Sequence, residues 1–281
     1  MDIGQQLGSE IVASQFLGQG TSGAGTVLTR HDLADGRSVV TKEDGTGGLE
    51  PEAHMLRYLA DKSSLPVPHL WYADDHVIVM DYLPGGEGVS GNSDVEVADA
   101  IAALHSIGTD NYGFDRDTLI GPLQQPNEWT SDWWTFFGEQ RLSYMANLCV
   151  EAGRADIRLV ARVEELAARL PELLDAPRPP GLVHGDLWGG NILCSDGRLS
   201  GFIDPAICFA DPEMDLAYGT LFGTLGPQFF ERYADHHPLS ADFWAARRDI
   251  YNLWPLLVHV RLFGGHYLGE VTAILRRYGA H

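Results

Sequence analysis

Residues 182–193 of the chain read Leu-Val-His-Gly-Asp-Leu-Trp-Gly-Gly-Asn-Ile-Leu. An apolar pair at each end flanks a polar, glycine-rich stretch, which predicts a strand, a loop and a second strand. The loop carries an acid, Asp186, and five residues later an amide, Asn191. A further apolar run, residues 199–203, ends in a second acid, Asp204. Two acids and an amide therefore lie at predicted strand ends.

This set of side chains suits phosphoryl transfer. The reaction needs one acid that takes or orients a hydroxyl proton, and an amide and a second acid that hold Mg²⁺. Taken one at a time, the residues are equally compatible with a simple turn and a surface acid. Their order, with apolar flanks on both sides, favours the kinase interpretation, because a motif counts only in its structural context.

Composition limits the classes of partner. At 281 residues, with 44% hydrophobic residues, the chain can bury the core of one large domain or of two lobes. Its net charge of −20 and pI near 4.7 argue against nucleic acid or an anionic membrane as a partner, because both carry the same sign. An anionic nucleotide must therefore be attracted by local positive groups or by Mg²⁺.

The cysteines and the apolar segments suggest a cytoplasmic protein. Three cysteines, Cys149, Cys194 and Cys208, are widely spaced, so neither a disulfide framework nor a zinc site is expected. This pattern favours a reducing compartment. The first ten residues lack the basic and apolar regions of a signal peptide, and no apolar run is long enough to span a membrane.

Residues 1–83 predict a small lobe of strands with one helix. Gly18, Gly20 and Gly23 lie in a glycine-rich turn between predicted strands at 10–16 and 26–29. Such a turn can bring backbone N–H groups close to a phosphate, since no Cβ stands in the way. A flexible hairpin is the alternative. The β-branched residues that follow disfavour a Rossmann fold, which needs a helix there.

Lys42 closes the next predicted strand, residues 38–42, and can reach nucleotide phosphates or lie exposed at a sheet edge. Its partner decides between these possibilities. In the helix predicted over 49–59, Glu52 precedes Met55 and Leu56 by three and four residues, so it can point inward and pair with Lys42. Glu50 is the competing partner.

Two more strands, residues 69–73 and 76–83, follow a proline-rich connector. The second runs through Asp81, Tyr82 and Leu83 into Pro84, which is typical of a strand that leaves a small lobe through a hinge. In a kinase, the backbone of such a hinge binds adenine.

Residues 84–281 predict a larger, mainly helical lobe. Ser93 and Glu96 suggest a capping box, and residues 108–130 are expected to be loops, with Trp129 in a polar setting. Pro255 predicts a kink or break in a long helix. Asp215 either accepts N–H bonds from the 182–193 loop or is a solvated helix acid. The expected helices cover residues 97–105, 133–152, 156–174, 213–224, 226–235, 239–262 and 266–277.

Together these features resemble the fructosamine kinase (ketosamine kinase) family, a branch of the protein-kinase-like fold related to aminoglycoside and choline kinases. His-Gly-Asp with a following Asn is common to that wider group, whereas the other segments are more specific. The resemblance covers nearly the whole chain and rests on Lys42 with Glu52, Asn111–Phe114, Pro126–Trp129, Asp132-Trp133, Phe136-Phe137, His184–Asn191, Ile203–Ala206, Asp211–Ala217 and Leu262–Gly264.

The resemblance implies a bilobal α+β fold and ATP-dependent phosphorylation of the sugar 3-hydroxyl of a ketosamine, a deglycation step. Asp186 would be the catalytic base, and Asn191 and Asp204 the Mg²⁺ ligands. Lys42 and Glu52 would position the phosphates. The remaining assignments are Trp188, Trp129 and His259 to the acceptor, and His184 and Asp215 to structural support.

Two positions depart from the family pattern near the C-terminus. Leu256-Leu257-Val258-His259 stands where the family usually has Leu-Leu-Asn-His, and Pro255 lies in a region usually rich in tyrosine. Both departures can alter the shape of the acceptor pocket or only local packing. The glycine-rich turn contains no cysteine, so redox regulation through that turn is not expected.

Two other functions remain open. The first is a kinase of another small acceptor, such as an aminoglycoside, a choline-like amine or a free sugar, because the fold does not fix the acceptor. The second is a nucleotide-binding pseudokinase, against which the complete set of Lys42, Glu52, Asp186, Asn191 and Asp204 argues. A monomer is expected. The acceptor is a free ketosamine or a glycated lysine.

Overall fold

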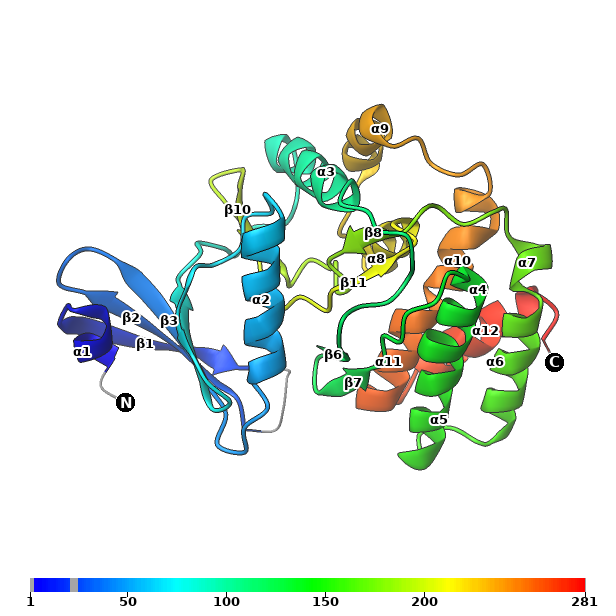
Figure 1. Cartoon of the computed structure of the whole chain (residues 1–281), viewed down its shortest axis with the longest axis horizontal. Coiled ribbons are helices and arrows are strands. Elements are labelled where there is room, and N and C mark those ends of the chain that lie inside the picture. Colours follow the sequence, from blue (N-terminus) through cyan, green and yellow to red (C-terminus); the bar gives the residue numbers. More distant parts are fainter. Residues whose placement is uncertain (1–2, 21–24, 281) are drawn as a thin grey trace.

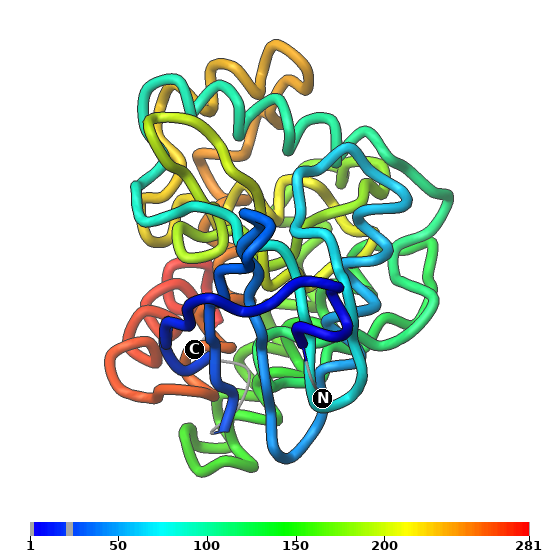
Figure 2. The backbone as a smooth tube through the Cα atoms, turned by 90° about the vertical axis from the view of Figure 1, so that its left-hand side faces the viewer, coloured from blue at the N-terminus to red at the C-terminus, as the bar shows by residue number. Residues whose placement is uncertain are grey.

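The computed structural model describes residues 3–20 and 25–280. Figure 1 shows a small lobe of strands beside a larger lobe of helices, as the resemblance predicts. Figure 2 looks onto the small lobe, which lies across the front of the helical lobe. No helix in the described residues is long and apolar enough to cross a membrane.

The small lobe is built on a five-stranded antiparallel sheet with the order β1-β2-β3-β5-β4. A short helix, α1 (Ile3–Leu7), precedes it. Lys42 pairs with Leu28 on one side and Ile78 on the other. It therefore lies on a central strand, and the edge-strand alternative is wrong. The strands are β1 (Ile11–Gln19), β2 (Val27–Leu33), β3 (Ser38–Glu43), β4 (Leu70–Ala73) and β5 (Val77–Asp81).

Helix α2 (Glu50–Lys62) links the two lobes. Pro51 lies in its first turn, where the missing N–H costs nothing. Ala53 and Leu56 pack on the sheet side, whereas Met55 and Leu59 belong to the main core of the large lobe. The helix that carries Glu52 is thus held from both sides.

The large lobe is mainly helical, as predicted, but two expected helices are broken. The helix expected over 156–174 ends at Ala168 because Pro171 starts a separate turn. In the one expected over 239–262, a break at Asn252 places Pro255 in the first turn of a new helix, which confirms the predicted break. The helical elements are α3 (Asn92–His105), α4 (Trp133–Thr135), the π-helix η1 (Phe136–Ser143), α5 (Tyr144–Glu151), α6 (Arg158–Ala168), α7 (Leu170–Leu173), α8 (Glu213–Leu221), α9 (Pro227–His236), the π-helix η2 (Phe243–Arg247), α10 (Arg248–Tyr251), α11 (Leu253–Phe263) and α12 (Tyr267–Arg277).

The capping box expected before α3 is wrong. The Ser93 hydroxyl donates to the Ser90 carbonyl and accepts from the Ser90 N–H. Glu96 instead accepts from the Leu199 N–H at 2.8 Å and pairs with Arg198. A tertiary partner on a neighbouring strand has replaced the local one.

Three two-stranded sheets complete the large lobe. One of them lies in the stretch 108–130, which was expected to be only loop; its strands have three residues each, too short for a periodic pattern. The pairs are β6 (Thr118–Ile120) with β7 (Leu123–Gln125), β8 (Gly181–Val183) with β11 (Cys208–Ala210), and β9 (Ile192–Ser195) with β10 (Arg198–Phe202).

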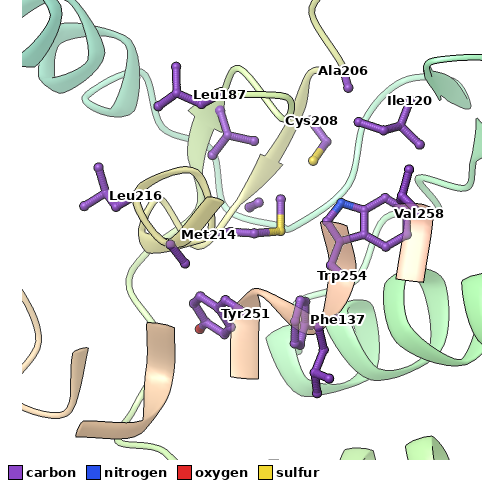
Figure 3. Packing of buried hydrophobic residues seen from close by; sticks show 14 of the residues in the cluster. Ile120, Phe137, Leu187, Ala206, Cys208, Met214, Leu216, Tyr251, Trp254 and Val258 are labelled. Atoms are coloured by element: carbon purple, nitrogen blue, oxygen red, sulfur yellow. The ribbon is translucent and has the colours of Figure 1, made fainter. Parts of the chain in front are cut away.

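The main core joins residues that are distant in sequence. Figure 3 shows Ile120 of β6 facing Ala206 and Cys208, with Trp254 and Val258 of α11 nearby. Val258, the departure from the family pattern, is 3% exposed and belongs to this core. The valine that stands here in place of the family's asparagine therefore packs inside the core.

A buried ion-pair cluster fastens the helices around α8. The Arg247 guanidinium is fully buried and lies 2.8 Å from the Asp211 carboxylate, which is also fully buried. Glu213 and Asp242 lie 3.2 and 3.1 Å from its Nε. Tyr251 donates to Asp211 at 2.7 Å. Asp211 also accepts from the Glu213 N–H at 3.0 Å, just before α8 begins.

Replacing Arg247 with alanine should destabilise the protein by about 3–5 kcal/mol, because it leaves buried carboxylates without a counter-charge. The matched control is Arg248→Ala, which removes a partly exposed partner of Asp249 and should cost at most about 1 kcal/mol. Urea unfolding of both variants measures the difference. Equal losses would contradict the importance assigned to the cluster.

Candidate active site

The second residue of the 184–191 loop is a glycine that no other residue can replace. Gly185 has φ of +81°, and a Cβ at this position would lie 2.0 Å from the Ala206 carbonyl oxygen. The Ala206 N–H in turn donates to the His184 carbonyl at 2.8 Å. The loop and the segment after Asp204 are therefore in direct backbone contact.

Asp215 holds this loop from below. Its two carboxylate oxygens accept the N–H groups of His184 at 2.7 Å and Gly185 at 2.8 Å. Asp215 is 1% exposed, so the prediction that it binds the loop is confirmed and the solvated-acid alternative is wrong. A fully buried carboxylate with two N–H donors fixes the loop backbone firmly.

His184 acts through its buried ring. Burial lowers its pKa, so the imidazole stays neutral. Its Nδ1 accepts from the Asp186 N–H at 3.3 Å. This contact positions the backbone of Asp186 itself.

The Asp186 carboxylate is held by two neighbours. Asn191 donates from Nδ2 to its Oδ2 at 2.8 Å and to its main-chain carbonyl at 2.9 Å. Tyr218 of α8 is also hydrogen-bonded to the carboxylate. Burial raises the pKa of Asp186 to about 7, although both hydrogen bonds act to lower it. Such a value suits a group that exchanges a proton near neutral pH.

Lys42 joins the two lobes. Its Nζ lies 2.6 Å from Glu52 and 2.9 Å from Asp204. Burial alone would lower its pKa, but the carboxylates of Asp204 and Glu52 outweigh burial and raise it, so the ammonium stays charged. Glu50 lies 3.5 Å from Arg116 instead, which settles the choice of partner in favour of Glu52.

The oxygen donors of Asn191 and Asp204 fit Mg²⁺, which protein groups and substrate phosphates usually bind together. The described residues hold no group of three or more His, Cys, Asp or Glu side chains that could bind an ion by themselves. Mg²⁺ is usually bound by one or two carboxylates together with substrate phosphates. Because Asn191 uses Nδ2 as a donor to Asp186, its Oδ1 is the atom left for a metal. The Asn191 carbonyl also accepts from the Ile203 N–H at 3.0 Å, which places Asn191 beside Asp204.

The glycine-rich turn is fastened to the end of β3. The Gly20 N–H donates to the Thr26 carbonyl at 3.0 Å, and the Thr26 hydroxyl donates to Asp44 at 2.7 Å. Gly18 lies within β1, and Gly23 lies outside the described residues. The N–H of Gly20 is thus used to close the hairpin. A phosphate role for this turn stays a prediction.

Asp81 ends β5, and Tyr82 and Leu83 follow it. The Asp81 N–H donates to the His69 carbonyl and the Tyr82 N–H to the Ser38 carbonyl, both at 3.0 Å. Neither residue therefore has a free N–H for adenine. Leu83 is the remaining candidate donor among the three.

The three acceptor candidates fall into two groups. Trp188 and His259 both contact the ring of Phe222, with centroids 6.3 and 5.1 Å away. Trp129 packs instead on Phe209 at 6.0 Å. Trp188 and Phe222 are 37% and 44% exposed, so an aromatic surface borders the loop that carries Asp186.

Two residues of this site were not predicted. Tyr218 lies one helical turn after Asp215 on α8, and that spacing could have drawn attention to it. Phe222 ends the same helix, but nothing in the sequence distinguishes it from a core residue. Both depend on how α8 lies beneath the loop.

Comparison with known proteins agrees with this geometry. The sequence profile of the Fructosamine kinase family matches residues 39–280. Probable ketoamine kinase YniA of Escherichia coli K12 is 37% identical over 227 residues, which cover 79% of this chain and 77% of that protein. Probable ketoamine kinase VP1481 of Vibrio parahaemolyticus is 34% identical over 236 residues, which cover 82% of this chain and 80% of the relative.

Solved structures extend the similarity to the whole fold. A crystal structure from Thermobifida fusca, designated a candidate fructosamine-3-kinase, has a TM-score of 0.87 at 31% identity and covers 98% of this chain and 96% of its own. The aminoglycoside phosphotransferase APH(4)-Ia, crystallised with ADP and hygromycin B, has a TM-score of 0.66 at 19% identity and covers 99% of this chain and 98% of its own. This second likeness concerns the protein-kinase-like fold alone. The chain belongs to the fructosamine kinase family, a family of small-molecule kinases.

Proposed function

We propose that the protein is an ATP-dependent kinase that phosphorylates the sugar 3-hydroxyl of a ketosamine. One observation carries this proposal: Asp186 is hydrogen-bonded to Asn191 in the large lobe, while Asp204 meets the Lys42–Glu52 pair of the small lobe. These are the groups that phosphoryl transfer requires, and they converge from both lobes.

ATP would lie between residues 1–83 and residues 84–281. The Lys42 ammonium has three hydrogens, and two point at Glu52 and Asp204. The third would be donated to a nucleotide phosphate, with both pairs retained. The Leu83 N–H and the glycine-rich turn would contact adenine and the phosphates.

Asn191 and Asp204 would hold Mg²⁺. The ion, when bound, neutralises negative charge on the phosphates. Asp186 would accept the proton of the acceptor hydroxyl or orient that hydroxyl toward the phosphate. Catalysis would then consist mainly of positioning, supplied by Asp215, His184 and Tyr218 beneath the loop.

The acceptor would lie over the aromatic surface of Trp188 and Phe222. His259 is oriented toward it by its Nδ1, which bonds the Pro255 carbonyl at 2.7 Å. The names of the relatives support a ketosamine as acceptor. An aminoglycoside, a choline-like amine or a free sugar is the competing acceptor, and the net charge of −20 suits any cationic compound.

An acceptor panel tests the function directly. We expect ADP release with fructosyl-lysine, ribulosyl-lysine or a glycated protein, and little release with an aminoglycoside, choline or a free sugar. Loss of ADP release when Mg²⁺ is chelated is part of the expectation. Turnover of an aminoglycoside but of no ketosamine would refute the proposal.

Asp186→Asn should lower kcat by about 100-fold or more, because the amide cannot take the hydroxyl proton. The affinity for ATP should change little, since Lys42 and Asp204 are retained. Steady-state kinetics and calorimetric nucleotide binding measure the two quantities separately. Unchanged turnover would remove Asp186 from its catalytic role.

Trp188→Ala should raise the acceptor KM about tenfold, a typical effect of losing an aromatic contact, and leave the KM for ATP unchanged. Trp244→Ala is the matched control, because Trp244 is 51% exposed on η2 and packs on Phe230 and Phe243. An unaltered acceptor KM in Trp188→Ala would exclude sugar contact by this ring.

A further inference from the structure

Asp204 has a strained backbone. Its φ is +50°, a left-handed conformation that is uncommon for residues other than glycine. Such strain persists only where the surrounding structure imposes it. The hydrogen bonds that fix the residues after Asp204 therefore help to set the orientation of its carboxylate.

Side chains of the β6–β7 hairpin donate hydrogen bonds to the two residues that follow Pro205. Gln125 donates from Nε2 to the Ala206 carbonyl at 3.0 Å. Thr118 donates from Oγ1 to the Ile207 carbonyl at 3.3 Å. Both side chains are 1% exposed, so no water competes for these carbonyls.

The direction of the Thr118 bond is fixed by its neighbours. Its hydroxyl oxygen accepts from Gln125 Nε2 at 2.9 Å and from Asn127 Nδ2 at 2.8 Å. A hydroxyl has one hydrogen and two lone pairs. With both lone pairs occupied, its hydrogen is left for the Ile207 carbonyl.

Asn127 is itself anchored by a buried arginine. Arg141 of η1 is 0% exposed and donates from Nη2 to Asn127 Oδ1 at 2.6 Å. It also donates to the Pro126 carbonyl at 2.6 Å, the Gln140 carbonyl at 3.2 Å and the Cys208 sulfur at 3.3 Å. The guanidinium also lies over the Phe136 ring, 4.4 Å from its centroid, so hydrogen bonds and an aromatic face together hold it in the core.

Residues just before the β6–β7 hairpin contact α2. Phe114 packs edge-on against Tyr58, with centroids 4.8 Å apart, and Arg116 lies 3.5 Å from Glu50. In Figure 1 the hairpin lies between α2 and the helices of the large lobe. Residues 111–127, which we name the brace, thus contact both the helix that carries Glu52 and the segment that follows Asp204.

We propose that the brace sets the position of Asp204 for metal binding, with Thr118 and Gln125 as positioning residues. They act through the Ala206 and Ile207 carbonyls and touch neither nucleotide nor acceptor. In consequence, the metal-binding segment and α2 are held together in one arrangement before any ligand arrives. The inference rests on the proposed role of Asp204 as a Mg²⁺ ligand.

The test compares the affinity for AMP-PNP with and without Mg²⁺, measured by calorimetry. Thr118→Val keeps the shape and removes the hydroxyl, and Gln125→Leu removes the amide. Both should reduce the Mg²⁺-dependent gain in affinity about fivefold or more, as expected when a buried carbonyl loses its donor. The metal-free affinity should stay unchanged. Gln125→Asn, which withdraws the amide by one methylene, serves if Gln125→Leu does not fold.

Two controls separate positioning from simple packing. Thr118→Ser restores the hydroxyl, and Gln124→Leu alters the exposed neighbour in β7; both should behave as wild type. A wild-type Mg²⁺ gain in Thr118→Val and Gln125→Leu would overturn the inference, even if their melting temperatures fall. If the gain is lost but wild type phosphorylates no ketosamine, the brace stands and the proposed acceptor fails.

Discussion

The Lys42 ammonium, buried between two carboxylates, is the interaction on which the arrangement of the two lobes depends. A buried charge costs several kcal/mol unless it is paired. Lys42 satisfies this requirement only by taking one partner from α2 and the other from the large lobe. The two lobes are thus connected by this buried ion pair as well as by apolar packing across α2.

Beneath this bond, the 184–191 loop is held by buried groups. Asp215 fixes its backbone and His184 supports Asp186 from inside the core. The same principle recurs in the brace, where a buried hydroxyl and a buried amide hold two backbone carbonyls shortly after Asp204. Rigid support from the core lets a short loop keep its acid and its amide in register without added disulfides.

Much of the fold and of the site could be predicted because the signals are local. The small-lobe strands, the inward Glu52 and the break near Pro255 all follow from spacing within one element. The contacts of the brace could not be predicted, since Thr118 and Gln125 lie 89 and 81 positions away in sequence from the residues whose carbonyls they bind. The expected capping box at Ser93 was wrong for a related reason: Glu96 found a stronger partner more than 100 residues away.

The contact between Gly185 and the Ala206 carbonyl also limits the evolution of this enzyme. No side chain fits at position 185 while that carbonyl stays where it is, and the carbonyl is held by Gln125. A side chain at position 185 therefore requires the Ala206 carbonyl to move, and with it the Gln125 side chain of the hairpin. Gly185 is thus expected to resist substitution, whereas Trp188 and Phe222, which are 37% and 44% exposed, have room to change.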